Sequence, residues 1–343
     1  ALGNIADVMN LKEKETRYLC YKGIKNINNH FLKALIEKNS YSLENKYNID
    51  KIGWVIAPKL NGTIRSGTQQ EKEDMFKAFI SDDYEFALKV ADQCKKAKEK
   101  QDRMVKNAIP KIEKNIEINK NDRCLIIEVS KTLHQEHMGL VANKLQEKYG
   151  VPILLYKNKK DISVQGSARG NNNITNDFKT DLKESQLCDF CEGQPNAFGW
   201  GIKKDNIEKL KQYLNNLYKD KEVISGKTYE IDFILNEETF DSNLVYQLLP
   251  FEDEWGNGLD NPLILFKNLL VYVDENNIKG KRTHNLVFEI KGIKFIKKFL
   301  TNVLKDTLLK NKYNNITCIG KVSNNIYNGN TYPQIEIIDL EVI

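Results

Sequence analysis

The sequence lacks the features of a membrane or secreted protein. None of its apolar runs approaches the roughly 20 residues that a helix needs to span a bilayer. The sequence has no basic n-region followed by an apolar h-region, so we expect no signal peptide and a cytoplasmic location.

Cysteine is scarce and scattered, with six residues in 343. This density does not suit a disulfide-stabilised secreted fold. Only Cys188 and Cys191 are close in the sequence, and no second pair or nearby histidine completes a zinc site. We interpret the cysteines as buried or half-buried thiols in a reducing cytosol.

What is present is the composition of an ordinary globular protein, with 41% apolar and 29% charged residues. The length predicts two or three domains. The net charge of +5 is compatible with a polyanionic partner, although function depends on where that charge lies.

Residues 1–80 mix helical patterns with short apolar segments, and residues 81–118 are predicted as one long helix. Its start carries capping and acidic residues, and its apolar positions follow one face. Pro110 should kink the helix or end its first part. The helix is either a connector between globular regions or an ordinary surface helix. We favour the connector because the sequence changes character on both flanks.

Residues 120–220 predict an α/β domain. Cys124–Val129 and Val151–Tyr156 are short apolar runs typical of buried strands, and Gly139–Gly150 is a helical pattern that ends in a glycine stop. We predict glycine-rich turns at Gly166–Arg169 and Gly193–Ile202. Backbone N–H groups in such turns, beside a guanidinium, would provide a seat for a phosphate.

From Lys227 onward the apolar period changes to two, which predicts strands. Five or six strands in this segment indicate a small β-barrel, and a short helix is predicted at Thr239–Leu248, before Pro250-Phe251. A turn is predicted at Asn328–Asn330.

These motifs carry a family resemblance. The order of Gly139-Leu-Val-Ala142, Gly166-Ser-Ala-Arg169 and Gly193-Gln-Pro-Asn-Ala-Phe-Gly199 resembles the DHH-associated domain of the DHH phosphoesterase superfamily. Ala1–Leu11 resembles the last motif of the RecJ catalytic domain. Ile56–Arg65 resembles a family segment with the sequence Ala-Pro-Arg-Leu-Asn-Ala-Ala-Gly-Arg. These flanking motifs narrow the resemblance to the RecJ-like single-strand-specific exonucleases. The motifs occur in the same order as in that family over nearly the whole chain.

The resemblance implies a fold that is α/β plus all-β. Residues 1–80 would be the end of a DHH catalytic domain, 81–119 a long connector helix, 120–220 the DHH-associated α/β domain, and 221–343 an oligonucleotide-binding (OB-type) barrel. In the family this barrel begins with the motif Pro-Phe-Gly-x-Gly-Asn-Pro. Here the motif is divided into Pro250-Phe251, an insert that contains Trp255, and then Gly256-Asn257 and Asn261-Pro262.

The family cleaves phosphodiesters with two divalent ions, manganese or magnesium, held by aspartates and histidines. Asp7 matches the metal-ligand aspartate of the last catalytic motif, although an aspartate in an apolar context is commonly a helix cap or a hydrogen-bonded core residue. No Asp-His-His run exists, no Asp-x-Asp precedes Asp7, and the four histidines are dispersed. The chain therefore resembles a C-terminal portion without the N-terminal DHH motifs. We expect it to be inactive alone, because one aspartate cannot hold two ions.

The resemblance also implies a phosphate site. Ser167 and Arg169 match the family turn that binds a DNA phosphate, where the pattern alone allows an ordinary turn with an exposed arginine. Asn61 and Arg65 lie in the segment that lines the DNA path in the family, with a surface arginine as the simpler alternative.

Two further positions are implied to be catalytic. His134 aligns with a family histidine that precedes the helix. Gln194 stands where the family has a histidine, and Glu192 where it has a glycine. Glutamine can donate a hydrogen bond to a phosphate but cannot titrate near neutral pH, which puts an acid role here in doubt.

In the barrel, aromatic side chains would stack bases while lysines follow the backbone. The aromatic candidates are Tyr327, Tyr332, Phe288 and Tyr272, and the basic ones are Lys279, Lys281, Arg282, Lys291 and Lys294. We expect half of these aromatics to fill the barrel interior.

The preferred hypothesis is part of a metal-dependent 5′-to-3′ single-stranded-DNA exonuclease in DNA repair or recombination. The alternative is a non-catalytic single-strand-binding or accessory subunit that pairs with a separately encoded DHH half. The two differ in whether DHH motifs lie upstream in the same reading frame. A phosphodiesterase for small nucleotides fits less well, because an appended barrel suggests a polymeric substrate.

Overall fold

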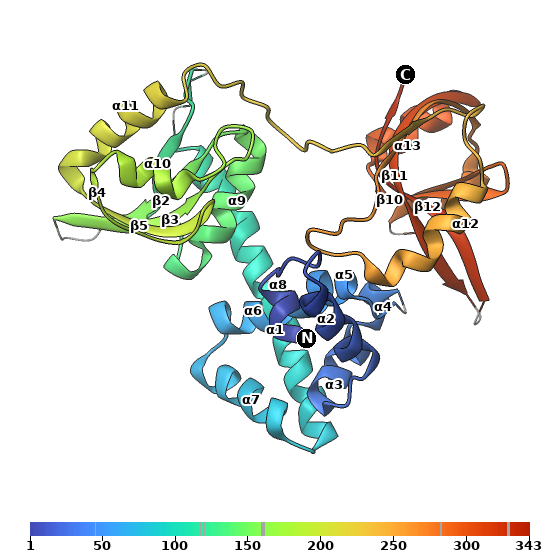
Figure 1. The fold of residues 1–343 in the computed structure, drawn as a ribbon, viewed down its shortest axis with the longest axis horizontal. Coiled ribbons are helices and arrows are strands. Elements are labelled where there is room, and N and C mark those ends of the chain that lie inside the picture. The colour runs from blue at the N-terminus through green and yellow to red at the C-terminus, as the bar shows by residue number, and fades with distance from the viewer. Residues whose placement is uncertain (45, 117, 120, 159–161, 282, 328–329) are drawn as a thin grey trace. The chain divides into compact units, whose positions relative to one another are not determined.

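The computed structural model describes residues 1–44, 46–116, 118–119, 121–158, 162–281, 283–327 and 330–343. The chain, drawn in Figure 1 with colour running from the N- to the C-terminus, forms two compact units. The first unit contains residues 1–58, 76–92 and 229–343, and the second contains 59–75 and 93–228. The four-part division of the sequence stays a prediction.

The helix predicted for 81–118 is α8, which runs from Tyr84 to Glu113. Asp83 begins it, because its carboxylate accepts the N–H of Phe86. Pro110 lies within the helix, which ends soon afterwards at Glu113. The helix starts in the first unit and continues into the second.

The second unit is built on a five-stranded sheet with the order β1-β2-β3-β5-β4. β1 and β2 are parallel, and the other pairs are antiparallel. The strands are β1 (Leu125–Glu128), β2 (Ile153–Lys157), β3 (Ser163–Arg169), β4 (Cys188–Gln194) and β5 (Ala197–Lys203).

Helices cover both faces of this sheet. On one face, α9 (Met138–Tyr149) and the end of α8 bury Leu145 against Ile127 and Ile153. On the other, α10 (Phe178–Glu184) and α11 (Ile207–Leu217) pack around the fully buried Trp200. The labels α9, α10 and α11 locate these helices around the sheet in Figure 1. The predicted strands at 124–129 and 151–156 and the helix at 139–150 are confirmed.

The two predicted glycine turns are wrong, because both segments are mainly strand. Gly166–Arg169 forms the end of β3, and Gly193–Ile202 contributes the end of β4 and most of β5. Gly166 and Gly201 do not form turns here, but their lack of a side chain lets neighbouring strands approach closely. A Cβ at Gly166 would lie 1.7 Å from the carbonyl oxygen of Leu155 on β2, and one at Gly201 would meet the ring of Phe190.

The first unit starts with short helices. They are α1 (Leu2–Ala6), α2 (Lys14–Lys25), α3 (His30–Lys38), α4 (Ser40–Leu43), α5 (Ile49–Lys51) and a π-helical turn at Ile52–Ile56. The helices α6 (Ala57–Ser66) and α7 (Gln69–Ile80) follow, and residues 59–75 of this segment belong to the second unit.

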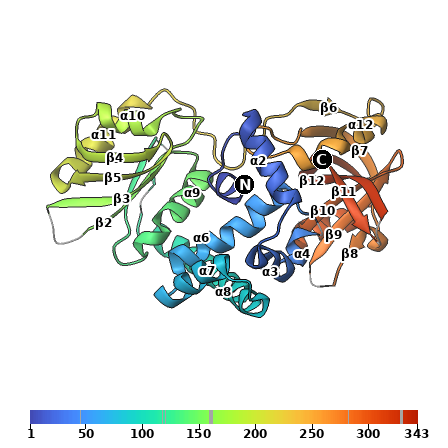
Figure 2. The same ribbon diagram turned by 60° about the horizontal axis from the view of Figure 1, so that its bottom comes forward.

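The C-terminal part of the first unit is a seven-stranded mixed sheet with the order β6-β7-β11-β12-β10-β9-β8, seen together in Figure 2. Its strands are β6 (Phe233–Leu235), β7 (Ile264–Tyr272), β8 (Ile278–Lys279), β9 (His284–Ile290), β10 (Ile293–Leu300), β11 (Tyr313–Tyr327) and β12 (Asn330–Val342). The helices α12 (Asn243–Leu248) and α13 (Asn302–Lys310) accompany it.

The predicted closed barrel is not confirmed. Over the described residues the sheet is open, with β6 at one edge and β8 at the other. The helix predicted at Thr239–Leu248 starts at Asn243. The predicted turn at Asn328–Asn330 falls mostly outside the described residues.

The core of this sheet is aromatic. Phe240, Phe266 and Phe295 are buried with ring centroids 4.9–5.9 Å apart. Phe288 stacks on Phe295 at 5.1 Å and is 4% exposed. Phe288 is therefore a core residue and not a base-stacking surface.

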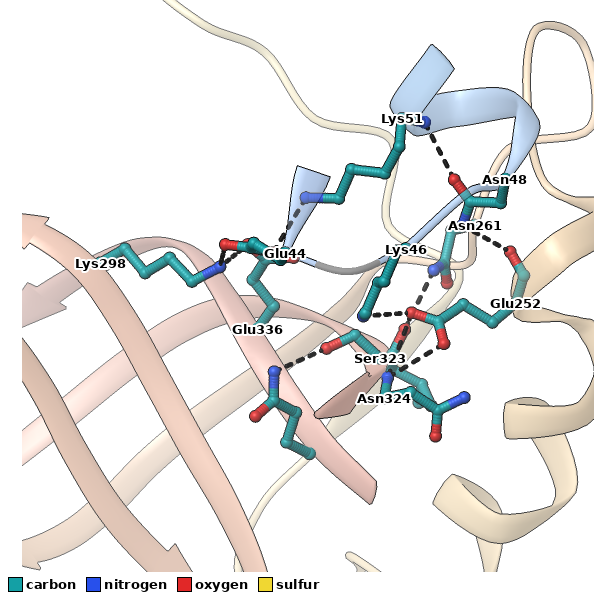
Figure 3. Close-up of polar contacts among 12 residues, drawn as sticks. Glu44, Lys46, Asn48, Lys51, Glu252, Asn261, Lys298, Ser323, Asn324 and Glu336 are labelled. Atoms are coloured by element: carbon teal, nitrogen blue, oxygen red, sulfur yellow. Dashed lines mark hydrogen bonds and ion pairs between the residues drawn. The ribbon is translucent and has the colours of Figure 1, made fainter. Parts of the chain in front are cut away.

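A polar network joins the N-terminal helices to this sheet, as Figure 3 shows. Glu252 lies at its centre. Its carboxylate accepts the ammonium of Lys46 at 2.6 Å, and its two oxygens accept the N–H of Asn324, each at 3.1 Å. Both side chains of the ion pair are about one-tenth exposed, at 13% for Glu252 and 11% for Lys46.

A second pair of contacts lies beside the first. The carboxylate of Glu44 accepts hydrogen bonds from the ammonium groups of Lys51, at 2.9 Å, and Lys298. Lys298 also forms an ion pair with Glu336 at 3.4 Å. Burial acts to raise the pKa of Glu44, but the hydrogen bonds from Lys298 and Lys51 outweigh it and hold that pKa below its usual value. The carboxylate thus stabilises the fold above its unfolded pKa, and this contribution is lost as acid protonates it.

No helix in the described part of the chain is long and apolar enough to cross a membrane.

Candidate phosphate-binding site

The candidate site lies in the second unit, at the N-terminus of α9. A short 3₁₀ turn (Gln135–His137) leads into α9, and no side chain caps the first turn. The N-terminal N–H groups of a helix carry partial positive charge, so such an end favours an anion.

Arg169 lies at the last position of β3 and is directed to this helix end. Its neighbour Ala168 packs under α10 and α11, so alternation places the arginine on the α9 face. A Cβ at Gly139, in the first turn of α9, would lie only 2.4 Å from Nη2 of Arg169. The glycine therefore lets the guanidinium rest against the helix backbone.

The guanidinium of Arg169 has little internal compensation for its charge. It is half-buried and donates from Nη1 to the carbonyl of Ala168 at 2.7 Å. No carboxylate pairs with it among the described residues. Burial, and then the charge of Arg65, lowers its pKa, yet a guanidinium stays charged at any ordinary pH. Such a cation is favourable for an incoming phosphate.

Arg65 adds a second positive charge from α6. Its charge lowers the pKa values of both Arg169 and His137, which places it near both groups. Arg65 and Asn61 are exposed and four residues apart, so they share a helix face. Gly62 lies between them, where a Cβ would meet the backbone of Lys98 at 2.9 Å, so α6 and α8 pack closely.

His137 is the residue that sequence reasoning missed. It directly precedes α9, is 3% exposed, and its Nδ1 has no hydrogen-bond partner among the described residues. Burial is the main cause that lowers its pKa; His134 and Arg65 lower it further, against the raising effect of Glu136. The available signal was its position as helix N-cap, three residues after the histidine that matches the family.

The other predicted residues lie around this point. His134 and Gln194 are exposed, and Ser167 is half-buried on β3. Arg169 and Gln194 both pair with Ala197 of β5, so they occupy one row across the sheet. Phe198 packs under α10 and α11, which places Ala197 and that row on the α9 face. The structure thus brings Gln194 to the same sheet face and end as Arg169.

Asn196 has a structural role at this end of the sheet. Its side chain accepts the N–H of Phe178 at 3.0 Å and donates to Asn172 at 2.7 Å. Its carbonyl accepts the N–H of Gly170. The family-like Asn-Ala-x-Gly segment therefore fixes the loop after Arg169 and positions that arginine.

Asp7 lies in the first unit, as the exposed residue that ends α1. The next residue, Val8, has φ of 57°, a left-handed conformation that is costly for a β-branched residue. Asn257 stabilises it by donating to the Val8 carbonyl at 2.6 Å and by accepting the N–H of Leu11. The insert near Trp255 thus holds the motif that carries Asp7.

The described residues do not by themselves fit a metal centre. Among them, no three histidine, cysteine, aspartate or glutamate side chains converge as ligands.

Among the predicted base-stacking residues, Tyr332 is 48% exposed on β12 and Tyr272 is 46% exposed on β7. Tyr272 also meets the exposed Tyr313 edge-to-face at 5.4 Å. Tyr327 ends β11, but its side chain lies outside what the structure describes, as does Arg282. Lys291 donates to the carbonyls of Phe240 and Glu238, so its ammonium is already bound by the protein.

The second unit thus combines an α/β sheet with a helix N-terminus that lies beside Arg169, an arrangement that favours an anion. No protein-family model matches the chain. A protein of Bacillus subtilis strain 168, named as an SPbeta prophage-derived single-strand DNA-specific exonuclease, YorK, is 32% identical over an alignment of 367 residues. The yorK product of Bacillus phage SPbeta matches equally. Both alignments cover 100% of this chain and 63% of the relative.

Two crystal structures of RecJ from Thermus thermophilus, in complex with Mn²⁺ and with Mg²⁺, share the fold. Their TM-scores are 0.69 and 0.70 at 18% identity, over 99% of this chain and 48% and 51% of theirs. The resemblance that the motifs indicate is confirmed. The chain shares its fold with RecJ over 99% of its length, and it spans about half to two-thirds of the length of the proteins it matches.

Proposed function

We propose that this chain supplies the phosphate- and strand-binding part of a RecJ-like, metal-dependent 5′-to-3′ single-stranded-DNA exonuclease, acting in DNA repair or recombination. One observation carries the proposal: the half-buried guanidinium of Arg169 lies against the uncapped start of α9 with no carboxylate partner among the described residues. Such a site favours a phosphate over a neutral ligand.

The relatives support this assignment. The Bacillus proteins are named as single-strand DNA-specific exonucleases, and the Thermus RecJ structures contain manganese or magnesium. In this proposal Asp7 would contribute one ligand to a divalent ion. The residues of this chain bind and orient the strand. Arg169, Arg65 and the α9 terminus hold a phosphate, with Ser167 and Gln194 beside them.

The test of the phosphate site is the preference of the chain for strand ends. We expect a 5′-phosphorylated single strand to bind more tightly than the same strand with a 5′-hydroxyl, because only the former presents a terminal dianion to the two arginines. Fluorescence anisotropy with both strands, and with a 3′-phosphorylated control, measures this. Equal affinity for all three strands contradicts the proposal.

The C-terminal sheet is proposed to work as an OB-type surface that holds the rest of the strand. Exposed aromatic residues on a sheet can stack bases. Tyr332→Ala is therefore expected to reduce single-strand affinity by about 1–3 kcal/mol while leaving duplex affinity unchanged.

The matched control is Tyr313→Ala, which removes an exposed tyrosine from the pair with Tyr272 on another part of the same sheet. A loss with Tyr313→Ala and none with Tyr332→Ala would move the strand path to β7 and β11. No loss with either would mean that the sheet does not stack bases.

A further inference from the structure

The residue His137 has features that phosphate binding through arginines does not require. An imidazole in a residue that is only 3% exposed is normally fully hydrogen-bonded, yet Nδ1 of His137 has no partner among the described residues. It directly precedes α9, where the N–H groups of the first turn are also uncapped by side chains. The helix end and the imidazole therefore offer unused hydrogen-bonding capacity at one place.

The surroundings of His137 carry charges of both signs. Glu136, on its own segment, raises the pKa of His137, whereas His134 and, from α6, Arg65 lower it. Arg169, from β3, rests against Gly139 two residues further along the chain. In the absence of a bound phosphate, burial is the largest effect, and together with Arg65 it outweighs Glu136 and favours the neutral imidazole. A bound phosphate dianion would reverse the sign of the local field and favour a proton on Nδ1.

We propose that His137 is a specificity residue that couples binding of a terminal 5′-phosphate to uptake of one proton. This inference rests on the proposed function. The neutral imidazole takes a proton from solvent when the phosphate binds, and the imidazolium N–H donates to a phosphate oxygen. A terminal phosphate carries close to two negative charges at pH 7, whereas an internal phosphodiester carries one. The proton-linked contact thus favours a strand end over the interior of a strand.

The proton cannot come from the ligand. Neighbouring arginines favour the dianionic form of a phosphate monoester, so binding alone would release any residual proton from it. Net uptake must therefore occur on the protein. The linkage also gives the direction of the pH dependence: affinity for a 5′-phosphorylated strand falls as pH rises past the pKa of the free imidazole, by up to about tenfold per pH unit.

The experiment is calorimetric titration of the whole chain with a short 5′-phosphorylated oligothymidylate at pH 7, in buffers of different ionisation enthalpy. We expect close to one proton taken up per strand bound by the wild-type protein, and almost none by His137→Asn. His30→Asn removes a histidine from α3 in the first unit and is expected to keep the uptake. If His137→Asn does not fold, His137→Gln and the NMR shift of the His137 ring on adding strand give the same answer.

The outcomes separate this inference from the proposed function. A wild-type protein that does not distinguish 5′-phosphate from 5′-hydroxyl at any pH contradicts the proposed function. A wild-type protein that prefers the 5′-phosphate, but shows no proton uptake or keeps it in His137→Asn, overturns only the role of His137.

Discussion

Arg169→Ala is expected to weaken binding of a 5′-phosphorylated single strand by roughly 10- to 150-fold. The loss of a charge-assisted contact with a phosphate is worth about 1.5–3 kcal/mol, and each 1.4 kcal/mol is about tenfold in affinity. The effect on a 5′-hydroxyl strand should be much smaller. Anisotropy titrations of both strands against both proteins measure the difference.

Two variants make this result specific. Arg103→Ala removes an exposed arginine from α8 in the same unit and should change both affinities little. Gly139→Ala keeps every charge but places a Cβ where Arg169 Nη2 now lies, so the guanidinium must move. Alanine also favours the helix, so we expect weaker phosphate binding without loss of stability. Equal weakening of both strands by Arg169→Ala would show that this arginine contacts only the general backbone.

The second large effect concerns stability. Glu252→Ala is expected to reduce the free energy of unfolding of the first unit by about 3 kcal/mol, because removing one member of a largely buried ion pair leaves the other uncompensated. Lys46 would lose its carboxylate, and the Asn324 N–H would lose the oxygens that accept it. Urea denaturation measures the stability, and hydrogen exchange at Asn324 locates the change.

Glu254→Ala is the matched control. It removes an exposed glutamate from the 3₁₀ helix Leu249–Glu254, which also carries Glu252, and should change the stability little. Glu252→Gln keeps an oxygen for Asn324 and should lose less than alanine does. If Glu252→Ala and Glu254→Ala have the same effect, the network does not hold the N-terminal helices to the sheet.

Much of the second unit could be predicted because its elements are locally encoded. The apolar runs of β1 and β2 and the helical pattern of α9, with Gly150 left-handed at its end, identify themselves without knowledge of their neighbours. Gly166 and Gly201 were misinterpreted for the opposite reason. Glycine commonly marks a turn, and here its role depends on the Leu155 carbonyl and the Phe190 ring, which belong to neighbouring strands.

The candidate site was predictable only in part. The family-like motif identified Arg169, and the fold adds the cationic neighbourhood that Arg65 creates. His137 was missed because burial of a histidine at a helix start depends on tertiary packing. In the C-terminal sheet, the period-two alternation places Phe288 and its sequence neighbours on opposite faces but does not tell which face is buried. Only the stacking of Phe288 on Phe295 assigns it to the core.

The most direct test of the phosphate site is an NMR titration of the whole chain with ¹⁵N-labelled arginine side chains. The Arg169 signal is assigned by its loss in Arg169→Ala. We predict that a 5′-phosphorylated strand shifts the Arg169 and Arg65 signals strongly, while the 5′-hydroxyl strand leaves the Arg169 signal nearly unchanged and the Arg103 signal does not move with either. An Arg169 signal that is unaffected by a saturating 5′-phosphorylated strand would contradict the account.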